Sequence, residues 1–153
     1  MRFEHLVEIN DLDNPLIEPL SREQLWQGLQ LRAENPVPFT IGLDRFDVEA
    51  RHDDGFDRAL YFGPTVIRDR VTLIALRQVH YEIQPEPGQT GGSLTMSIEE
   101  PEAHRLFVRF VYVMRLADDA EPVTEEYQAF LKQAYEQADL DTIRLIREIA
   151  GST

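Results

Sequence analysis

The sequence contains no cysteine among its 153 residues. Disulfide bonds, thiolate metal sites and cysteine nucleophiles are therefore excluded. Histidine is also scarce, and its four copies show neither the i, i+4 helical spacing nor the H-E-x-x-H motif of zinc enzymes. The chain also lacks a Ser-His-Asp order, a glycine-rich phosphate loop and a dinucleotide-binding fingerprint. We therefore expect no metal site and no cofactor.

Basic residues are few, with 15 lysines and arginines against 28 aspartates and glutamates and a formal net charge of −13. Such a negative field repels the phosphates of nucleic acid and an anionic membrane surface. No apolar run approaches the roughly 20 residues that span a bilayer. The N-terminal MRFEHLVEIN has the features of neither a signal peptide nor a transit peptide. We expect a cytoplasmic protein that binds no nucleic acid and does not insert into a membrane.

Hydrophobic residues make up 42% of the chain and charged residues 28%, which is typical of a soluble globular protein. The length allows a sizeable buried core. No internal repeat, low-complexity segment or linker divides the sequence. We therefore predict a single domain covering residues 1–153.

The C-terminal stretch 122–151 contains no internal proline or glycine and predicts a helix roughly 40 Å long. Pro122 suits the first helical position, and Gly151 suits the C-terminal cap. Apolar residues recur at spacings of three and four and indicate one buried face. These residues are Val123, Tyr127, Phe130, Leu131, Ala134, Ala138, Ile143, Ile146 and Ile149.

The rest of the chain predicts mainly strands. Residues 2–10 alternate between polar and apolar side chains, and a helix follows, because Ser21 and Gln24 have the spacing of a capping box. That helix should end near Asn35, before two prolines. Further alternation predicts strands at 44–51, 57–62, 65–74, 77–84, 93–99 and 105–116.

The order of elements predicts an α+β fold. Each strand has one apolar and one polar face, so the antiparallel sheet should be covered on one side only. The long C-terminal helix is the natural cover. A curved sheet wrapped around a helix leaves room for a cavity between them.

Several sequence segments, in this order along the chain, resemble those of a known family. They are FEHLVEIN, LSREQLWQGL, RALYFGPTVIRDRV, GGSLTMSIEEPE, LFVRFVYVMR and AFLKQAY. Together they span nearly the whole chain, which resembles the helix-grip (SRPBCC) superfamily of START domains and birch-pollen-allergen (Bet v 1-like) proteins. The closer similarity is to its AtaL-like branch.

The resemblance implies a curved seven-stranded antiparallel sheet that grips a long C-terminal helix, with a short helical segment after the first strand. It also implies a cavity that holds a lipid, sterol, polyketide or other apolar molecule. A minority of the superfamily catalyses cyclisation or dehydration in this cavity. The AtaL-like branch supplies no catalytic motif, so no catalytic residue is transferred to this chain.

Two titratable residues fall on apolar strand faces. Asp69 alternates with Ile67 and Val71, where burial of a carboxylate costs several kcal/mol unless it is paired or protonated. Asp69 is either exposed or part of a structural hydrogen-bond network, or else it forms part of the cavity wall. His5 alternates with Phe3 and Val7, and it either forms a hydrogen bond at a sheet edge or lines the cavity.

Tyrosines on the apolar faces have two interpretations. They pack in the core, or their hydroxyls orient the polar end of an apolar ligand. Small residues in the middle of the long helix favour a space beneath it. The residues expected to contact the ligand are Trp26, Phe46, Tyr61, Asp69, Tyr81, Met96, Phe110, Tyr112, Met114, Tyr127, Phe130 and Ala134.

Three functions follow from these patterns. The first is binding of a small, largely apolar molecule between sheet and helix. The second is an enzyme of the cyclase or dehydratase type that uses Asp69, a tyrosine or His5 as acid–base groups. The third is an interaction module without a functional cavity.

Overall fold

The predicted alternation produces seven strands, and they form one antiparallel sheet in the order β1-β7-β6-β5-β4-β3-β2. The computed structural model describes residues 1–117 and 120–152. Its strands are β1 (Arg2–Glu8), β2 (Arg45–His52), β3 (Gly55–Phe62), β4 (Thr65–Ile74), β5 (Gln78–Ile83), β6 (Gly91–Glu102) and β7 (Arg105–Arg115). Its helices are α1 (Arg22–Glu34), the short 3-10 helix η1 (Val37–Phe39) and α2 (Glu125–Gly151).

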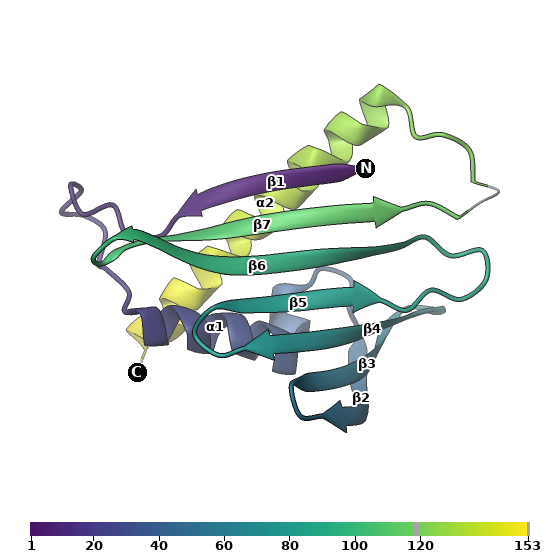
Figure 1. Ribbon diagram of the computed structural model, residues 1–153, viewed down its shortest axis with the longest axis horizontal. Helices are drawn as coiled ribbons and strands as arrows, with labels where there is room; N and C mark the ends of the chain where they lie inside the picture. The colour runs from purple at the N-terminus through teal and green to yellow at the C-terminus, as the bar shows by residue number, and fades with distance from the viewer. Residues whose placement is uncertain (118–119, 153) are drawn as a thin grey trace.

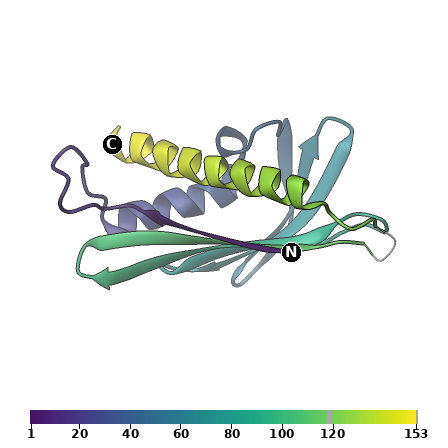
Figure 2. The ribbon, with the colours of Figure 1, turned by 90° about the horizontal axis from the view of Figure 1, so that it is seen from above.

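Both long helices lie over the same face of the sheet, and α2 crosses the sheet obliquely (Figures 1 and 2). The strands β2 and β3 rise from the sheet toward the helix side (Figure 2). The predicted fold class is therefore correct: a curved seven-stranded antiparallel sheet, a helix after the first strand and a long C-terminal helix. The edge strands are β1 and β2, and β2 has an irregular register between Val48 and Ala50.

Local sequence signals place the helix ends. Ser21 accepts a hydrogen bond from the backbone of Gln24, and the Gln24 side chain accepts one from the backbone of Ser21, which completes the predicted capping box. The cap of α2 differs from the prediction. Thr124 is its N-cap, because the threonine hydroxyl accepts a hydrogen bond from the third backbone N–H, and Pro122 lies before the helix. Gly151 is still helical.

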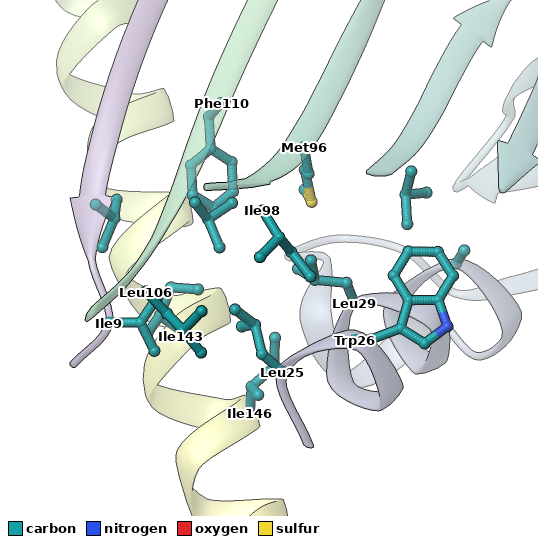
Figure 3. Packing of buried hydrophobic residues seen from close by; sticks show 14 of the residues in the cluster. Ile9, Leu25, Trp26, Leu29, Met96, Ile98, Leu106, Phe110, Ile143 and Ile146 are labelled. Carbon is teal, nitrogen blue, oxygen red and sulfur yellow. The ribbon is translucent and has the colours of Figure 1, made fainter. Parts of the chain in front are cut away.

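The core lies between the helices and the end of the sheet formed by β6 and β7 (Figure 3). Leu25 and Leu29 of α1 and Ile143 and Ile146 of α2 pack there beside strand side chains. The helices approach closely at Gly28, since a Cβ built on that residue would lie 2.4 Å from Ile146 Cγ2.

The predicted buried face of α2 is wrong in the N-terminal half of the helix. Tyr127 is 52% exposed, Phe130 is 63% exposed, and Ala134 also faces solvent. The inward positions are instead Tyr135, which is half-buried, and Asp139, which is buried. Because the two inward residues are polar, the spacing of apolar residues in this half of the helix identifies a different face, which is exposed.

Candidate functional site

A cavity of about 370 Å³ lies between the sheet and the helices. Residues from β1, β3 to β7, α1 and α2 line it, together with the segment after α1. Most of its lining is apolar, and Leu60, Phe62, Ile67, Ile83 and Leu94 supply aliphatic and aromatic walls from four strands. These residues face inward because side chains alternate along each strand.

Four predicted contact residues line this cavity: Asp69, Tyr81, Tyr112 and Met114. They come from β4, β5 and β7, three strands whose inward faces the sequence pattern predicted. Their assignment to ligand binding remains a prediction.

The other predicted contact residues lie elsewhere. Met96, Phe110 and Trp26 are buried in the hydrophobic core (Figure 3) and do not line the cavity. Phe46 is half-buried on the edge strand β2, outside the cavity lining. Tyr61 lies under the Arg45 guanidinium, whose Cζ is 3.7 Å from the ring centroid.

Tyr127, Phe130 and Ala134 also lie outside the cavity, on the exposed side of α2. Neither Ala134 nor Ala138 lines this cavity, although Ala138 lines a second hollow beside α2. These positions entered the prediction through the mistaken helix face. Their apolar character does not place them against the sheet.

Asp69 forms a buried ion pair with Arg58 in the cavity wall. Arg58 Nε donates to Asp69 Oδ1 at 2.9 Å, and Arg58 Nη2 donates to Asp69 Oδ2 at 2.6 Å. The third nitrogen, Nη1, donates to the backbone oxygen of Ala33 on α1 at 2.9 Å. The fork geometry offsets part of the cost of burying both charges. Asp69 thus combines two roles that the sequence left as alternatives, because it belongs to a structural pair and also faces the cavity.

The ring of Tyr81 lies between two guanidinium groups. The Cζ atoms of Arg58 and Arg32 are 5.0 Å and 5.1 Å from the ring centroid, within the range of cation–π contacts. The Tyr81 hydroxyl and Arg32 Nε are both buried and interact with each other, but the two atoms do not have the geometry of a well-formed hydrogen bond. Two strong hydrogen-bonding groups are therefore poorly satisfied at one wall of the cavity.

A second polar group connects the cavity to the β1 edge. The Tyr112 hydroxyl donates a hydrogen bond to Asp139 Oδ1, and His5 Nδ1 lies 3.0 Å from Asp139 Oδ2. The Tyr112 ring stacks on Tyr135, with centroids 4.1 Å apart and planes 8° from parallel. His5 does not line the cavity; it is half-buried on the edge strand and hydrogen-bonded to α2.

Burial controls the proton affinity of this second group. It raises the pKa of Asp139 from 3.8 to about 6, although the hydrogen bonds from Tyr112 and His5 favour the ionised carboxylate. Burial and the adjacent Asp139 carboxylate both raise the pKa of the Tyr112 phenol. Asp139 consequently titrates close to neutral pH, whereas Tyr112 stays protonated and donates its hydrogen bond.

A second hollow of about 710 Å³ lies between the segment 37–41 and α2. It shares Arg32, Thr40, Leu94, Tyr112 and Tyr135 with the first cavity. These shared residues form the boundary between the two spaces.

Besides several apolar wall residues, sequence reasoning missed three charged residues of the site: Arg32, Arg58 and Asp139. Arg58 alternates with Phe56 and Leu60, which is the same signal that identified Asp69. Arg32 follows Leu29 by three residues and thus shares its helix face. Asp139 precedes Ile143 by four residues and would have been found with the correct face of α2.

The described residues contain no group of three histidine or acidic side chains arranged to hold a metal ion. Within the same part of the chain, no helix is both long and apolar enough to cross a membrane.

A comparison with known protein families identifies the family of this chain. The model described as "Acetylaranotin biosynthesis cluster protein L" (AtaL) matches residues 7–152. The chain belongs to the AtaL family. A search of curated protein sequences returned no match to this AtaL-family chain.

Solved structures share the fold of this AtaL-family protein. Ara h 8.0201 is 12% identical, with a TM-score of 0.66 over 97% of this chain and 98% of the other. The Zhui aromatase/cyclase from Streptomyces sp. R1128 is 15% identical, with a TM-score of 0.64 over 99% and 93%. The di-domain aromatase/cyclase StfQ of the steffimycin biosynthetic pathway is 14% identical, with a TM-score of 0.68. That match covers 98% of this chain and 52% of StfQ. These similarities establish the helix-grip fold.

Proposed function

We propose that this AtaL-family protein binds a small, largely apolar molecule in the cavity between the sheet and the helices. The observation that carries the proposal is the mainly apolar 370 Å³ cavity with a few inward polar groups. Ligand pockets generally have this composition and lie at about 300–1,000 Å³. The fold shared with aromatase/cyclases is consistent with an apolar, ring-containing ligand.

Titration with the neutral fluorescent probe N-phenyl-1-naphthylamine tests the proposal. Ile67→Trp adds side-chain volume within the cavity wall, whereas Ala134→Trp adds the same side chain on the exposed face of α2. We expect Ile67→Trp to weaken probe binding by about tenfold or more, since overpacking of a filled site costs about 1–3 kcal/mol. We expect Ala134→Trp to leave affinity unchanged.

Equal affinity of the wild type and both folded variants would contradict binding in this cavity. Thermal melts of each variant establish that the fold is retained. Native mass spectrometry of freshly purified protein complements the titration, because a co-purifying small molecule would identify the natural ligand directly.

A second candidate function is acid–base catalysis of the cyclase or dehydratase type. The Tyr112–Asp139–His5 group favours it, because a cavity hydroxyl is hydrogen-bonded to a carboxylate with a pKa of about 6. Groups that titrate near the working pH are efficient proton donors and acceptors. Asp69 is a poorer candidate, since both of its oxygens accept hydrogen bonds from Arg58.

Deuterium exchange at the methyl group of 2-acetylnaphthalene tests this second function by NMR. Catalysis predicts faster exchange with the wild type than in buffer, and loss of that rate in Tyr112→Phe. Tyr61→Phe removes a hydroxyl outside the cavity lining and should keep the rate. Exchange at the buffer rate with saturated wild-type protein would contradict catalysis while leaving the binding function intact.

A further inference from the structure

Only one of the two guanidinium groups at the polar wall of the cavity is in direct contact with a carboxylate. The charge of Arg58 is matched by Asp69 through two hydrogen bonds, and the remaining Arg58 donor is used by Ala33. Arg32 forms no ion pair with any residue that the structure describes, and its guanidinium interacts with the ring and the hydroxyl of Tyr81. The wall therefore presents one guanidinium, that of Arg32, without a carboxylate in direct contact.

Acidic groups near Arg32 are already engaged. Asp139 acts on Arg32 only through space, because its two oxygens contact Tyr112 and His5. Asp69 is occupied by Arg58. Tyr81 offers Arg32 its ring face and a nearby hydroxyl rather than a carboxylate.

Arg32 and the Tyr81 hydroxyl are suited to the same class of ligand. A buried donor without a partner costs about 1–3 kcal/mol, and more for a charged group. Tyr81 lines the cavity and is only 5% exposed, and its buried hydroxyl interacts with Arg32. A planar oxyanion fits this pair, because a guanidinium fork and a hydroxyl both donate to carboxylate oxygens.

We infer that the cavity accepts an apolar acid, whose carboxylate binds Arg32 and the Tyr81 hydroxyl while its apolar body lies against the aliphatic walls. This inference rests on the proposed binding function and specifies its ligand class. The charge of the chain as a whole does not produce this selectivity, because a net charge of −13 disfavours anions at long range. Selectivity arises within the cavity, where the low dielectric strengthens a direct charge contact.

A matched pair of ligands tests the inference. The anion 2-naphthoate and the neutral 2-naphthamide have the same aromatic body and nearly the same shape. At neutral pH we expect wild-type protein to bind the acid about ten- to a hundredfold more tightly, because hydrogen bonds to charged groups are stronger than neutral ones. Isothermal titration calorimetry gives both dissociation constants.

Two variants assign the preference to the polar wall. Arg32→Gln should bring the acid-to-amide affinity ratio close to one and keep the affinity for the amide. Tyr81→Phe should reduce the ratio several-fold, since it removes only the hydroxyl. Arg77→Gln removes the same charge from an exposed turn and should leave the ratio unchanged, which controls for net charge.

The outcomes separate this inference from the function on which it rests. Equal binding of acid and amide by the wild type, or an unchanged preference in folded Arg32→Gln, overturns the carboxylate site while cavity binding stands. Failure of both naphthyl compounds and of N-phenyl-1-naphthylamine to bind would overturn the proposed function as well. A thermal melt of Arg32→Gln shows that the ratio was measured on folded protein.

Discussion

Replacing Asp139 with asparagine should remove a pH-dependent penalty from the stability of the fold. The Asp139 side chain is 1% exposed, and burial raises its pKa from 3.8 to about 6. A shift of about 2 units corresponds to about 3 kcal/mol. Asparagine has nearly the same shape and still offers an oxygen to the Tyr112 hydroxyl and an N–H group to His5 Nδ1.

The sign follows from proton linkage. The folded pKa lies above the unfolded one, so the native state holds the proton more tightly between the two values. The stabilising contribution of Asp139 is therefore complete below pH 3.8 and is lost as pH rises through about 6. Asp139→Asn should gain up to about 3 kcal/mol relative to wild type between acidic and neutral pH.

Urea unfolding at several pH values between about 4 and about 7 measures this difference, because subtraction cancels titrations common to both proteins. Among these are Asp57 and Glu99, whose pKa values are lowered by hydrogen bonds from Arg70 and Arg109, respectively. Asp141→Asn on the same helix is the control, since that side chain is 39% exposed. A stability difference for Asp139→Asn that is constant with pH, or that falls as pH rises, would refute the reasoning.

Two further substitutions and one fluorescence measurement probe the packing. Gly28→Ala should destabilise the fold by about 1–3 kcal/mol in urea melts, because the new Cβ would lie 2.4 Å from Ile146 Cγ2. Asp69→Asn should cost about 3 kcal/mol at neutral pH, because it leaves the buried Arg58 guanidinium without a counter-charge. Trp26 should emit at short wavelength and change little when N-phenyl-1-naphthylamine binds, since the indole is 7% exposed and outside the cavity lining.

Controls accompany these changes. Gly151→Ala places a Cβ where no atom lies within 4 Å, so it should be neutral or slightly stabilising. A melt of Gly28→Ala equal to that of Gly151→Ala would contradict the close helix contact. An unfolding curve of Asp69→Asn equal to that of the wild type would show that Arg58 is stable without its partner. Strong quenching of Trp26 by the probe would place the ligand near the N-terminal half of α1, away from Arg32.

The strands could be predicted from sequence because burial on one face imposes a period of two residues. Residues 65–74 were predicted as a strand and form β4 with the same bounds, and Asp69 faces inward as its alternation indicated. The capping box of Ser21 is equally local. Such features depend on neighbours in the chain, so one sequence contains the information that specifies them.

The α2 side of the site was harder to predict because the helix residues that face inward there are polar. On α2, Tyr135 and Asp139 occupy the face toward the sheet, while Phe130 and Ala134 lie outside. Apolar periodicity therefore selected the wrong side of the helix. The Arg58 pair shows the same limit, since its partner lies 11 residues away on another strand and only the sheet register brings them opposite each other.

The β2 edge of the sheet affects how the protein behaves at high concentration. An unpaired strand edge is a template for cross-chain β-pairing and aggregation. On β2, the irregular register between Val48 and Ala50 interrupts that template, and the charged Arg45, Asp47 and Glu49 border it. A protein that leaves an apolar cavity beside an open sheet is thereby guarded against fibril-like growth, and its net charge of −13 adds mutual repulsion between molecules.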